Sequence, residues 1–458
     1  MLSQDENKTL TSVGPDTIMG RLLRRYWTPA LLAVEAPQPD SPPVRIRLLG
    51  EDLVAFRDTA GKVGLFVQAC PHRGASLFFG RNEEAGLRCV YHGWKFDVSG
   101  ACVDMPSEPA ESNFKSKVRV RAYPAHESGG IIWAYMGPPE TMPPFRDLGT
   151  EVIPPETARA AKQITYCNWI QALEGNIDTS HISWLHQYSD LMDTPDDGSD
   201  RPGYPTQAKS WYLWAQDRAP RLEVQDTEYG FKYAGIRTTP NGHTHVRVTA
   251  YIMPYQTIVA GMPIRAGGTT FVPRDDETCW RFTVTSGMLN RPFTYQADGA
   301  GGTPYQFPYG GPTGMGPMNG VIERRWLPEN NYQIDRSVQK SSLFTGIENF
   351  VSQDLMATES MGPVCDRSQE HLGNTDKAII RMRRLLLQTA RDLEERGIAP
   401  PATHPSPELS RVYSSEKILA PGEDWRTLGT PDDPMTREME AYPIEEARAK
   451  AAPEVTAG

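Results

Sequence analysis

Two short loops that each carry one Cys and one His place the strongest constraint on this chain. They are Cys70-Pro-His72 and, sixteen residues later, Cys89-Val-Tyr-His92. Two Cys and two His bind either a tetrahedral zinc or a two-iron, two-sulfide cluster with both thiolates on one iron and both imidazoles on the other. Zinc sites of this composition usually keep the Cys pair together and the His pair together. The mixed loops therefore favour the 2Fe-2S cluster, with zinc as the alternative.

Apolar and polar residues alternate around these loops, as in short half-buried strands. The pattern is seen in VRIRLL, DLVAFRD, VGLFVQA, KVRVRAYP and GIIWAYMG, between Val44 and Gly137. We therefore predict a small all-β domain of antiparallel strands over 44–140, with the metal loops on either side of a hairpin. The preceding segment, 1–43, contains a helix signal in TIMGRLLRRYW and a Pro-rich linker, and we expect it to pack on the rest of the chain.

The remainder alternates helix and strand signals. CNWIQALEGNIDTSHISWLH (167–186) predicts a helix, strand-like runs follow between 221 and 285, and further helices are expected near 344–361 and 376–396. The predicted fold class is α+β, with a larger domain over 141–430 in which helices flank an antiparallel sheet. Residues 298–320 form a Gly/Pro-rich loop, and 431–458 a polar C-terminal arm on the surface or disordered.

The charge balance is acidic, with 57 Asp and Glu against 47 Lys and Arg. This argues against a nucleic-acid partner, which needs a basic face. No window is long and apolar enough for a transmembrane helix, and the N-terminus lacks a secretory pattern. Six Cys in a chain of 458 residues do not form a disulfide framework, so we expect a reducing, cytoplasmic location and no membrane partner.

A second group of metal-binding residue types lies in the predicted helix over 167–186. Asp178 and His181 are three residues apart and would share one helix face, whereas His186 would point about 140° away from His181 on a regular helix. For both imidazoles to reach one ion, the helix must be irregular between Ile182 and Leu185. Two His and one carboxylate that leave positions open suit an Fe(II) that reacts with O2.

Together these motifs resemble the large (alpha) subunit of the Rieske non-haem iron aromatic-ring-hydroxylating oxygenases. The resemblance covers about residues 15–400. It includes CPHRG, CVYHGW and the D-x2-H-x4-H pattern of 178–186. QALEGNIDTSH, DRAPRLEV and ESMGPVCDRSQEHLG are similar to the phthalate dioxygenase group in particular.

This resemblance implies further site residues. The third iron ligand is expected to be Asp354, in a Gln-Asp pair on a late helix, with Glu348 and Glu359 as competitors. Asp178 is expected to relay electrons, by bonding both His181 and His92 of the partner subunit. That path implies a homo-oligomer of at least three chains, a trimer or stacked trimers. Glu174 is either an acid behind the iron ligands or a helix-surface residue.

The implied activity is the oxygenase component of a multi-component enzyme. It would use O2, and electrons from a separate NAD(P)H-dependent reductase, to hydroxylate a small aromatic substrate, expected to be a phthalate-like carboxylate. Arg221 and Arg247 could bind such a carboxylate through paired hydrogen bonds. Two alternatives remain: an O-demethylase with the same metal centres, and a Rieske electron-transfer protein without a catalytic iron.

Overall fold

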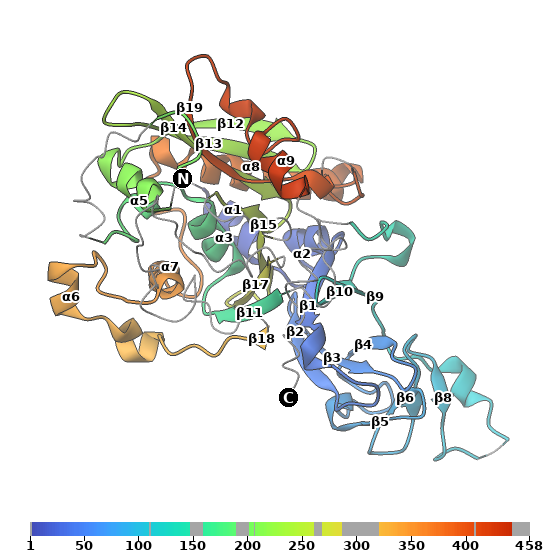
Figure 1. The fold of residues 1–458 in the computed structure, drawn as a ribbon. Coiled ribbons are helices and arrows are strands. Elements are labelled where there is room, and N and C mark those ends of the chain that lie inside the picture. Colours follow the sequence, from blue (N-terminus) through green and yellow to red (C-terminus); the bar gives the residue numbers. More distant parts are fainter. Residues whose placement is uncertain are drawn as a thin grey trace, which may run out of the picture.

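The computed structural model describes residues 2–109, 111–146, 159–188, 201–205, 207–260, 268–285, 320–406 and 409–441. In Figure 1 a small β-rich part, which includes β3, β4, β5, β6 and β8, projects from a larger part in which helices surround a broad sheet. The predicted α+β class is therefore confirmed.

The small part contains two antiparallel sheets. One has the order β2-β3-β4, with β2 (Val44–Leu48), β3 (Glu51–Arg57) and β4 (Val63–Val67). The other has the order β5-β6-β7-β8, with β5 (Arg81–Glu83), β6 (Gly86–Arg88), β7 (Lys95–Phe96) and β8 (Cys102–Asp104). They share a core that includes Val54, Phe56, Phe66, Leu77, Leu87, Trp94 and Phe96. The two metal loops follow β4 and join β6 to β7.

The N-terminal segment packs on the large part. It forms α1 (Gln4–Thr11), α2 (Ile18–Leu23) and β1 (Trp27–Leu32), and both helices contact α8 (Lys377–Arg396). The predicted helix ends before Trp27, because residues 27–32 are all buried and pair with β10 (Ile131–Tyr135). β10 also pairs with β9 (Ala125–Ser128), which completes a three-stranded sheet beside the small part.

A sheet with the path β12-β13-β14-β15-β16-β17-β11-β18 forms the centre of the large part, and β19 also pairs with β14. Its strands are β11 (Arg159–Thr165), β12 (Arg221–Thr227), β13 (Gly230–Thr238), β14 (Thr244–Ile252), β15 (Gln256–Ile258), β16 (Gly268–Pro273), β17 (Cys279–Thr285), β18 (Gly320–Val321) and β19 (Ser415–Leu419). Every pairing is antiparallel except that of β11 with β18. The sheet is thus mixed rather than wholly antiparallel as predicted, because β18 comes back along β11 after a long connection.

The helices of the large part are α3 (Trp169–Ile177), α5 (Gln207–Gln216), α6 (Arg336–Ser341), α7 (Phe350–Glu359), α8 and α9 (Pro434–Ala441). Short 3-10 turns are η1 (Ala33–Glu35), η2 (Leu77–Phe79), η3 (Phe114–Lys117), η4 (Pro139–Thr141), η5 (His181–Ser183), η7 (Pro328–Gln333), η8 (Asn374–Asp376), η9 (Leu409–Arg411) and η10 (Trp425–Thr427). The predicted helix over 376–396 is confirmed as α8, which ends at Gly397 in the left-handed conformation (φ 65°). α3 packs against β15, β16 and α7, and this contact brings the second group of candidate ligands together.

Two predicted segments lie mostly outside the described residues, namely the Gly/Pro-rich loop up to residue 319 and the arm beyond residue 441. In the described first part of the arm, Asp433 is buried and accepts a hydrogen bond from Tyr204 just before α9 begins. Within the described ranges, no helix is long and apolar enough to cross a membrane.

Candidate metal centres

The two Cys/His loops of the small part have the same backbone design. Cys70 N–H donates to the Ala75 carbonyl and Cys89 N–H to the Trp94 carbonyl, both at 2.8 Å. In each loop the residue four after the Cys is a glycine with positive φ, 76° at Gly74 and 77° at Gly93. Each glycine N–H donates back to its Cys carbonyl, so both loops turn tightly around their Cys.

The four side chains of these loops point to one place. Both Cys are buried, at 3% exposure each, and the rings of His72 and His92 lie 4.3 Å apart between centroids. His72 also stacks on Trp94 at 4.3 Å. Burial raises the pKa of the Cys70 thiol to about 11, so a metal must take the place of its proton for the thiolate to form here.

The loop residues fit a cluster better than a single ion. The ligand atoms of His181, His186 and Asp354 all lie within 4.8 Å of one another. Among the described residues, no other group of three or more His, Cys, Asp or Glu meets this limit. The four loop donors do not meet that limit, although one tetrahedral zinc would draw them together at bond lengths of about 2.0–2.3 Å. His72 Nδ1 is buried and has no hydrogen-bond partner among the described residues, as expected of an atom reserved for a metal.

The second candidate centre begins where α3 ends. The helix predicted over 167–186 stops at Ile177, because Asp178 Oδ1 accepts hydrogen bonds from both the backbone N–H and the hydroxyl of Ser180, each at 2.7 Å. Such local bonds compete with helix continuation. The chain then makes the 3-10 turn η5, and Trp184 leaves it at φ −133°. The predicted irregularity at 182–185 is therefore present, but the helix itself ends earlier than predicted.

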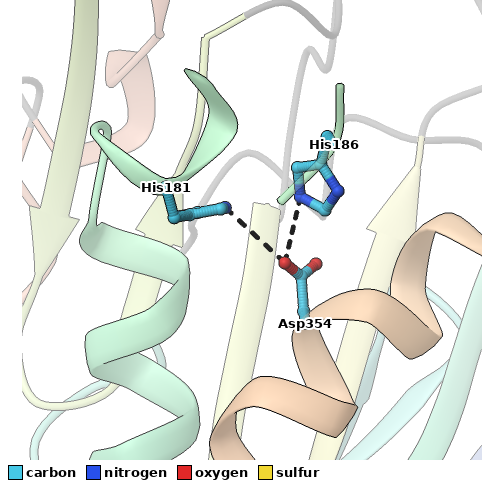
Figure 2. A group of neighbouring side chains, drawn as sticks. All are labelled: His181, His186 and Asp354. Carbon is cyan, nitrogen blue, oxygen red and sulfur yellow. Dashed lines mark ion pairs between the residues drawn. The ribbon is translucent and has the colours of Figure 1, made fainter. Parts of the chain in front are cut away.

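These two breaks bring both imidazoles to one carboxylate. Asp354 Oδ1, on α7, lies 3.0 Å from His186 Nε2 and 3.5 Å from His181 Nε2. Figure 2 shows the two contacts meeting at a single oxygen, with the rings on separate short segments above α7. Two imidazole nitrogens and one carboxylate oxygen at these distances can bind one divalent iron.

The other nitrogen of each ring faces an oxygen of a neighbouring side chain. His186 Nδ1 lies 2.6 Å from Gln353 Oε1, and Gln353 Nε2 donates to the Ile347 carbonyl at 2.7 Å. His181 Nδ1 lies 3.6 Å from Asp178 Oδ2. Because the Gln353 oxygen accepts, Nδ1 of His186 carries the proton and its Nε2 is left for a metal, whereas the 3.6 Å separation at His181 Nδ1 is a charge contact without a hydrogen bond. Metal-binding His residues commonly have such partners.

Electrostatics keeps both carboxylates ionised. Burial tends to raise the pKa of Asp354, but His186, His181 and Arg281 outweigh it and lower the pKa. Burial likewise opposes ionisation of Asp178, and the contacts with His181 and Ser180 lower its pKa. Both acids are thus available as anions at neutral pH.

The competing acids have other partners or lie elsewhere. Glu359 accepts two hydrogen bonds from Arg324, at 2.6 and 2.9 Å, and Glu348 is not part of the three-residue group. Glu174, whose role was open, is paired with Arg367 at 2.9 Å and Arg383 at 2.6 Å. Glu174 therefore joins α3 to α8.

Both arginines that were predicted to bind substrate already have partners within the protein. The Arg221 side chain is 63% exposed and paired with Glu223. Arg247 is buried and donates to Glu416, to the Thr179 hydroxyl and to the Ala260 carbonyl. A substrate contact by either residue stays a prediction.

Sequence reasoning did not find the buried residues that contact the segment between α3 and η5, which leads to His181. Thr179, Arg237 and Glu416 are all buried. Arg237 donates a hydrogen bond to the carbonyl of Thr179, which follows Asp178 in the chain. Glu416 accepts one from Arg247, which also donates to the Thr179 hydroxyl. Thr179 lies inside the D-x2-H pattern, where the pattern leaves the residue type open. Nothing in the sequence indicates that Glu416, far along the chain, pairs with β14.

Comparison with known families gives two matches. The Rieske 2Fe-2S domain model matches residues 27–124, and the model described as "LigXa C-terminal domain like" matches residues 134–295 and 320–448. The first therefore covers both Cys/His loops, and the second covers all three members of the His181, His186 and Asp354 group.

Curated relatives span nearly the whole chain. The phthalate 4,5-dioxygenase oxygenase subunit of Pseudomonas putida is 39% identical over 93% of this chain and 94% of its own length. The 3-chlorobenzoate-3,4-dioxygenase oxygenase subunit of Comamonas testosteroni is 37% identical over 92% and 96%. The 5,5'-dehydrodivanillate O-demethylase oxygenase subunit of a Sphingobium species is 32% identical over 90% and 86%.

A solved structure shows the same fold at lower identity. Dicamba monooxygenase bound to 3,6-dichlorosalicylic acid has a TM-score of 0.51 and 16% identity, over 82% of this chain and 99% of that one.

Proposed function

Because this chain belongs to the Rieske non-haem iron ring-hydroxylating oxygenases, as a large subunit of the phthalate dioxygenase-like group, we propose that it hydroxylates a small aromatic carboxylate. Two relatives that match more than 90% of this chain are named for phthalate and 3-chlorobenzoate, which are both aromatic carboxylates. The observation that carries the proposal is the convergence of His181, His186 and Asp354 within 4.8 Å, in a chain that also has a Rieske domain.

We assign the two metal centres to separate residue sets. Cys70, His72, Cys89 and His92 hold the 2Fe-2S cluster, and His181, His186 and Asp354 hold Fe(II). When bound, the cluster supplies electrons singly and the iron supplies the redox chemistry that consumes O2. Residues 44–140 and 141–430 are the corresponding domains, with 1–43 packed on the second and 431–458 as the C-terminal arm.

The chain's own groups prepare the second centre. Gln353 holds the proton on Nδ1 of His186, Asp178 lies 3.6 Å from Nδ1 of His181, and both Nε2 atoms face the same carboxylate oxygen of Asp354. Asp178 is also the proposed electron relay. His92 lies near the surface beside Tyr91, which is 56% exposed, so a neighbouring chain could approach it there.

Two partners follow from this assignment. Electrons come from a separate reductase that oxidises NAD(P)H, as the oxygenase-subunit relatives imply. The chain assembles as a trimer or as stacked trimers, in which Asp178 of one chain bonds His92 of the partner subunit.

O-demethylation of a methoxylated aromatic acid is the second candidate activity. It is favoured by the O-demethylase relative, which matches 90% of this chain. The electron-transfer alternative would leave the convergence of His181, His186 and Asp354 without a role.

The test combines an iron count with oxygen consumption. Wild-type protein should hold about three irons per chain, two in the cluster and one outside it. Asp354→Ala should hold about two, keep the visible spectrum of the cluster, and lose O2 uptake that depends on an aromatic acid and a reductase. Glu348→Ala should behave like wild type. If Glu348→Ala loses the third iron and Asp354→Ala keeps it, the ligand assignment is wrong.

Labelled O2 then separates the two activities. Ring dihydroxylation places two labelled oxygens in the product, whereas O-demethylation leaves at most one. A reconstituted wild type with about two irons per chain would instead support the electron-transfer alternative.

A further inference from the structure

Thr179, between Asp178 and Ser180, is held from two sides by the central sheet. Its hydroxyl accepts a hydrogen bond from Arg247 Nη1 at 3.1 Å, and its carbonyl accepts one from Arg237 Nη2 at 2.9 Å. The two arginines lie on neighbouring strands, β13 and β14. All three residues are buried, with Thr179 at 2%, Arg237 at 1% and Arg247 at 3% exposure.

A glycine makes room for this arrangement. A Cβ at Gly235, on β13, would lie 2.8 Å from Thr179 Cγ2, closer than real Cβ contacts, and 3.1 Å from its Oγ1, which is a tight contact. Gly235 pairs with Arg247 across the two strands and shares a face of β13 with Arg237. We call these three residues, Gly235, Arg237 and Arg247, the Thr179 socket.

The arginines of the socket are themselves fixed. Arg247 Nε lies 3.3 Å from Glu416 Oε2, and Glu416 Oε1 accepts hydrogen bonds from His245 Nε2 at 2.8 Å and Trp214 Nε1 at 3.0 Å. Arg237 Nε donates to the Asp217 carbonyl at 3.0 Å. Further hydrogen bonds to the rest of the large part therefore hold both socket arginines.

The socket arginines contact residues that precede and follow His181 in the chain. Thr179 precedes His181 in the chain, and Arg237 Nη2 also lies 3.2 Å from the hydroxyl of Ser183, which follows it. The segment between α3 and η5 is extended at Asp178 and has left the helix, so contacts to Thr179 and Ser183 decide its path.

We propose that the Thr179 socket sets the positions of Asp178 and His181 against Asp354, which makes Thr179, Arg237 and Arg247 positioning residues for the iron site. The inference rests on the proposed function, since the groups being positioned are the proposed ligand and relay. It gives Arg247 an internal role in addition to the predicted substrate contact. Groups behind metal ligands typically change metal affinity or activity by about 10- to 100-fold when removed.

The test compares Thr179→Val, which keeps the shape but lacks the hydroxyl, with Thr179→Ser, which keeps the hydroxyl. Protein freed of its mononuclear iron is dialysed against Fe(II), and the bound iron above that of Asp354→Ala is measured. Thr179→Val should bind Fe(II) on the order of tenfold more weakly than wild type. Thr179→Ser should stay within about twofold of wild type, because the Arg247 hydrogen bond remains.

A second measurement reports on the relay. The reduced cluster is mixed with substrate and O2, and its reoxidation is followed by visible absorbance in a single turnover. Reoxidation should slow in Thr179→Val by a factor similar to the loss in Fe(II) affinity, and Thr179→Ser should restore it. If Thr179→Val does not fold, Gly235→Ala serves in its place, since it displaces Thr179 without removing a hydrogen-bonding group.

The outcomes separate the inference from the proposed function. If folded Thr179→Val or Gly235→Ala binds Fe(II) and reoxidises its cluster as wild type does, the socket only stabilises the fold and the inference fails. If wild type binds no more Fe(II) than Asp354→Ala does, the proposed iron site itself is wrong.

Discussion

Gln353 decides which nitrogen of His186 faces the candidate iron position. Its side chain is fully buried, its Nε2 donates to the Ile347 carbonyl, and its Oε1 is therefore turned towards His186 Nδ1 at 2.6 Å. His186 is also stacked on Phe350 at 3.8 Å between ring centroids. The ring thus has one orientation and one tautomer, with Nε2 pointing at Asp354.

We predict that Gln353→Leu weakens Fe(II) binding by on the order of tenfold, because the Nδ1 proton loses its acceptor. Gln353→Glu keeps an acceptor at that position and should bind Fe(II) more tightly than the Leu variant. Equilibrium dialysis against Fe(II), with iron measured per chain, checks both. Equal affinities for the Leu and Glu variants would mean that the Nδ1 contact does not set the tautomer.

The sequence indicated which His and Asp residues lie together better than it indicated the path of the backbone between them. His181 and His186 were predicted to share an ion only if a helix were irregular at 182–185. That irregularity is present, but α3 also ends earlier than predicted, at Ile177, because Asp178 bonds Ser180 rather than continuing the helix. Periodicity cannot show this, since the decisive bonds come from an Asp side chain to a residue two places on. Asp354 was identified only through the family resemblance, because its helix is brought to α3 by long-range packing.

At the scale of elements, α7 is anchored at its C-terminal end by a buried ion pair. Glu359, its last residue, receives two hydrogen bonds from Arg324 and one from the Tyr332 hydroxyl at 2.7 Å. The Arg324 and Glu359 side chains are 2% and 1% exposed. This anchor holds the helix that carries Asp354.

Arg324→Met should lower the free energy of unfolding by about 3 kcal/mol, because it leaves the Glu359 carboxylate buried without its cation. The neighbouring Arg325 is exposed, so Arg325→Met is a matched control that should change the free energy by less than about 0.5 kcal/mol. Urea unfolding at neutral pH measures both. A loss of similar size in the two variants would contradict the anchor.

A buried charge that acid removes, the Glu416 carboxylate, lies where β19 pairs with β14. Burial tends to raise the pKa of Glu416, but the hydrogen bond from His245 and the charge of Arg247 lower it from 4.5 to about 2. A carboxyl with a lowered pKa in the folded state contributes stability that is complete above pH 4.5 and is lost as the pH falls towards 2. Burial also lowers the pKa of His245, which therefore contributes to acid sensitivity below pH 6.5 in the same direction.

We therefore predict that wild type loses about 1 kcal/mol through Glu416 by pH 4 and about 2 kcal/mol by pH 3, relative to pH 7. Glu416→Gln should be less stable than wild type at pH 7, because the amide cannot pair with Arg247 as a carboxylate does. The difference between the two should shrink on acidification. Urea unfolding at several pH values tests this, and a difference that stays constant with pH would show that Glu416 is not the titrating group.

On the scale of the whole molecule, the two candidate centres lie in different parts of the chain. The Cys/His loops lie in the small β-rich part that projects in Figure 1, whereas α3 and α7 lie in the large part. The sequence predicted this division, since each metal motif lies within one pattern of secondary structure. It could not predict the mixed sheet, which needs β18 to pair in parallel with β11 across more than a hundred residues.

The separation leads to a prediction about assembly. If electrons pass from the cluster of one chain to the iron of its neighbour, a chain without a cluster and a chain without iron should complement each other. Cys89→Ser removes a proposed cluster ligand and Asp354→Ala a proposed iron ligand, so neither variant alone should oxidise substrate. We expect mixed oligomers to regain activity, because a neighbour supplies the missing centre.

The two variants are co-expressed with different tags, and oligomers that contain both are isolated by two affinity steps. Any such trimer with cyclic symmetry has one interface at which an intact cluster meets an intact iron site, so activity should be about one third of wild type. Native mass measurement confirms that the sample is mixed. If electrons passed only within a single chain, no subunit of the mixed trimer would be active, because each lacks one of the two centres. A mixed trimer without activity would therefore show that the electron path does not cross between chains.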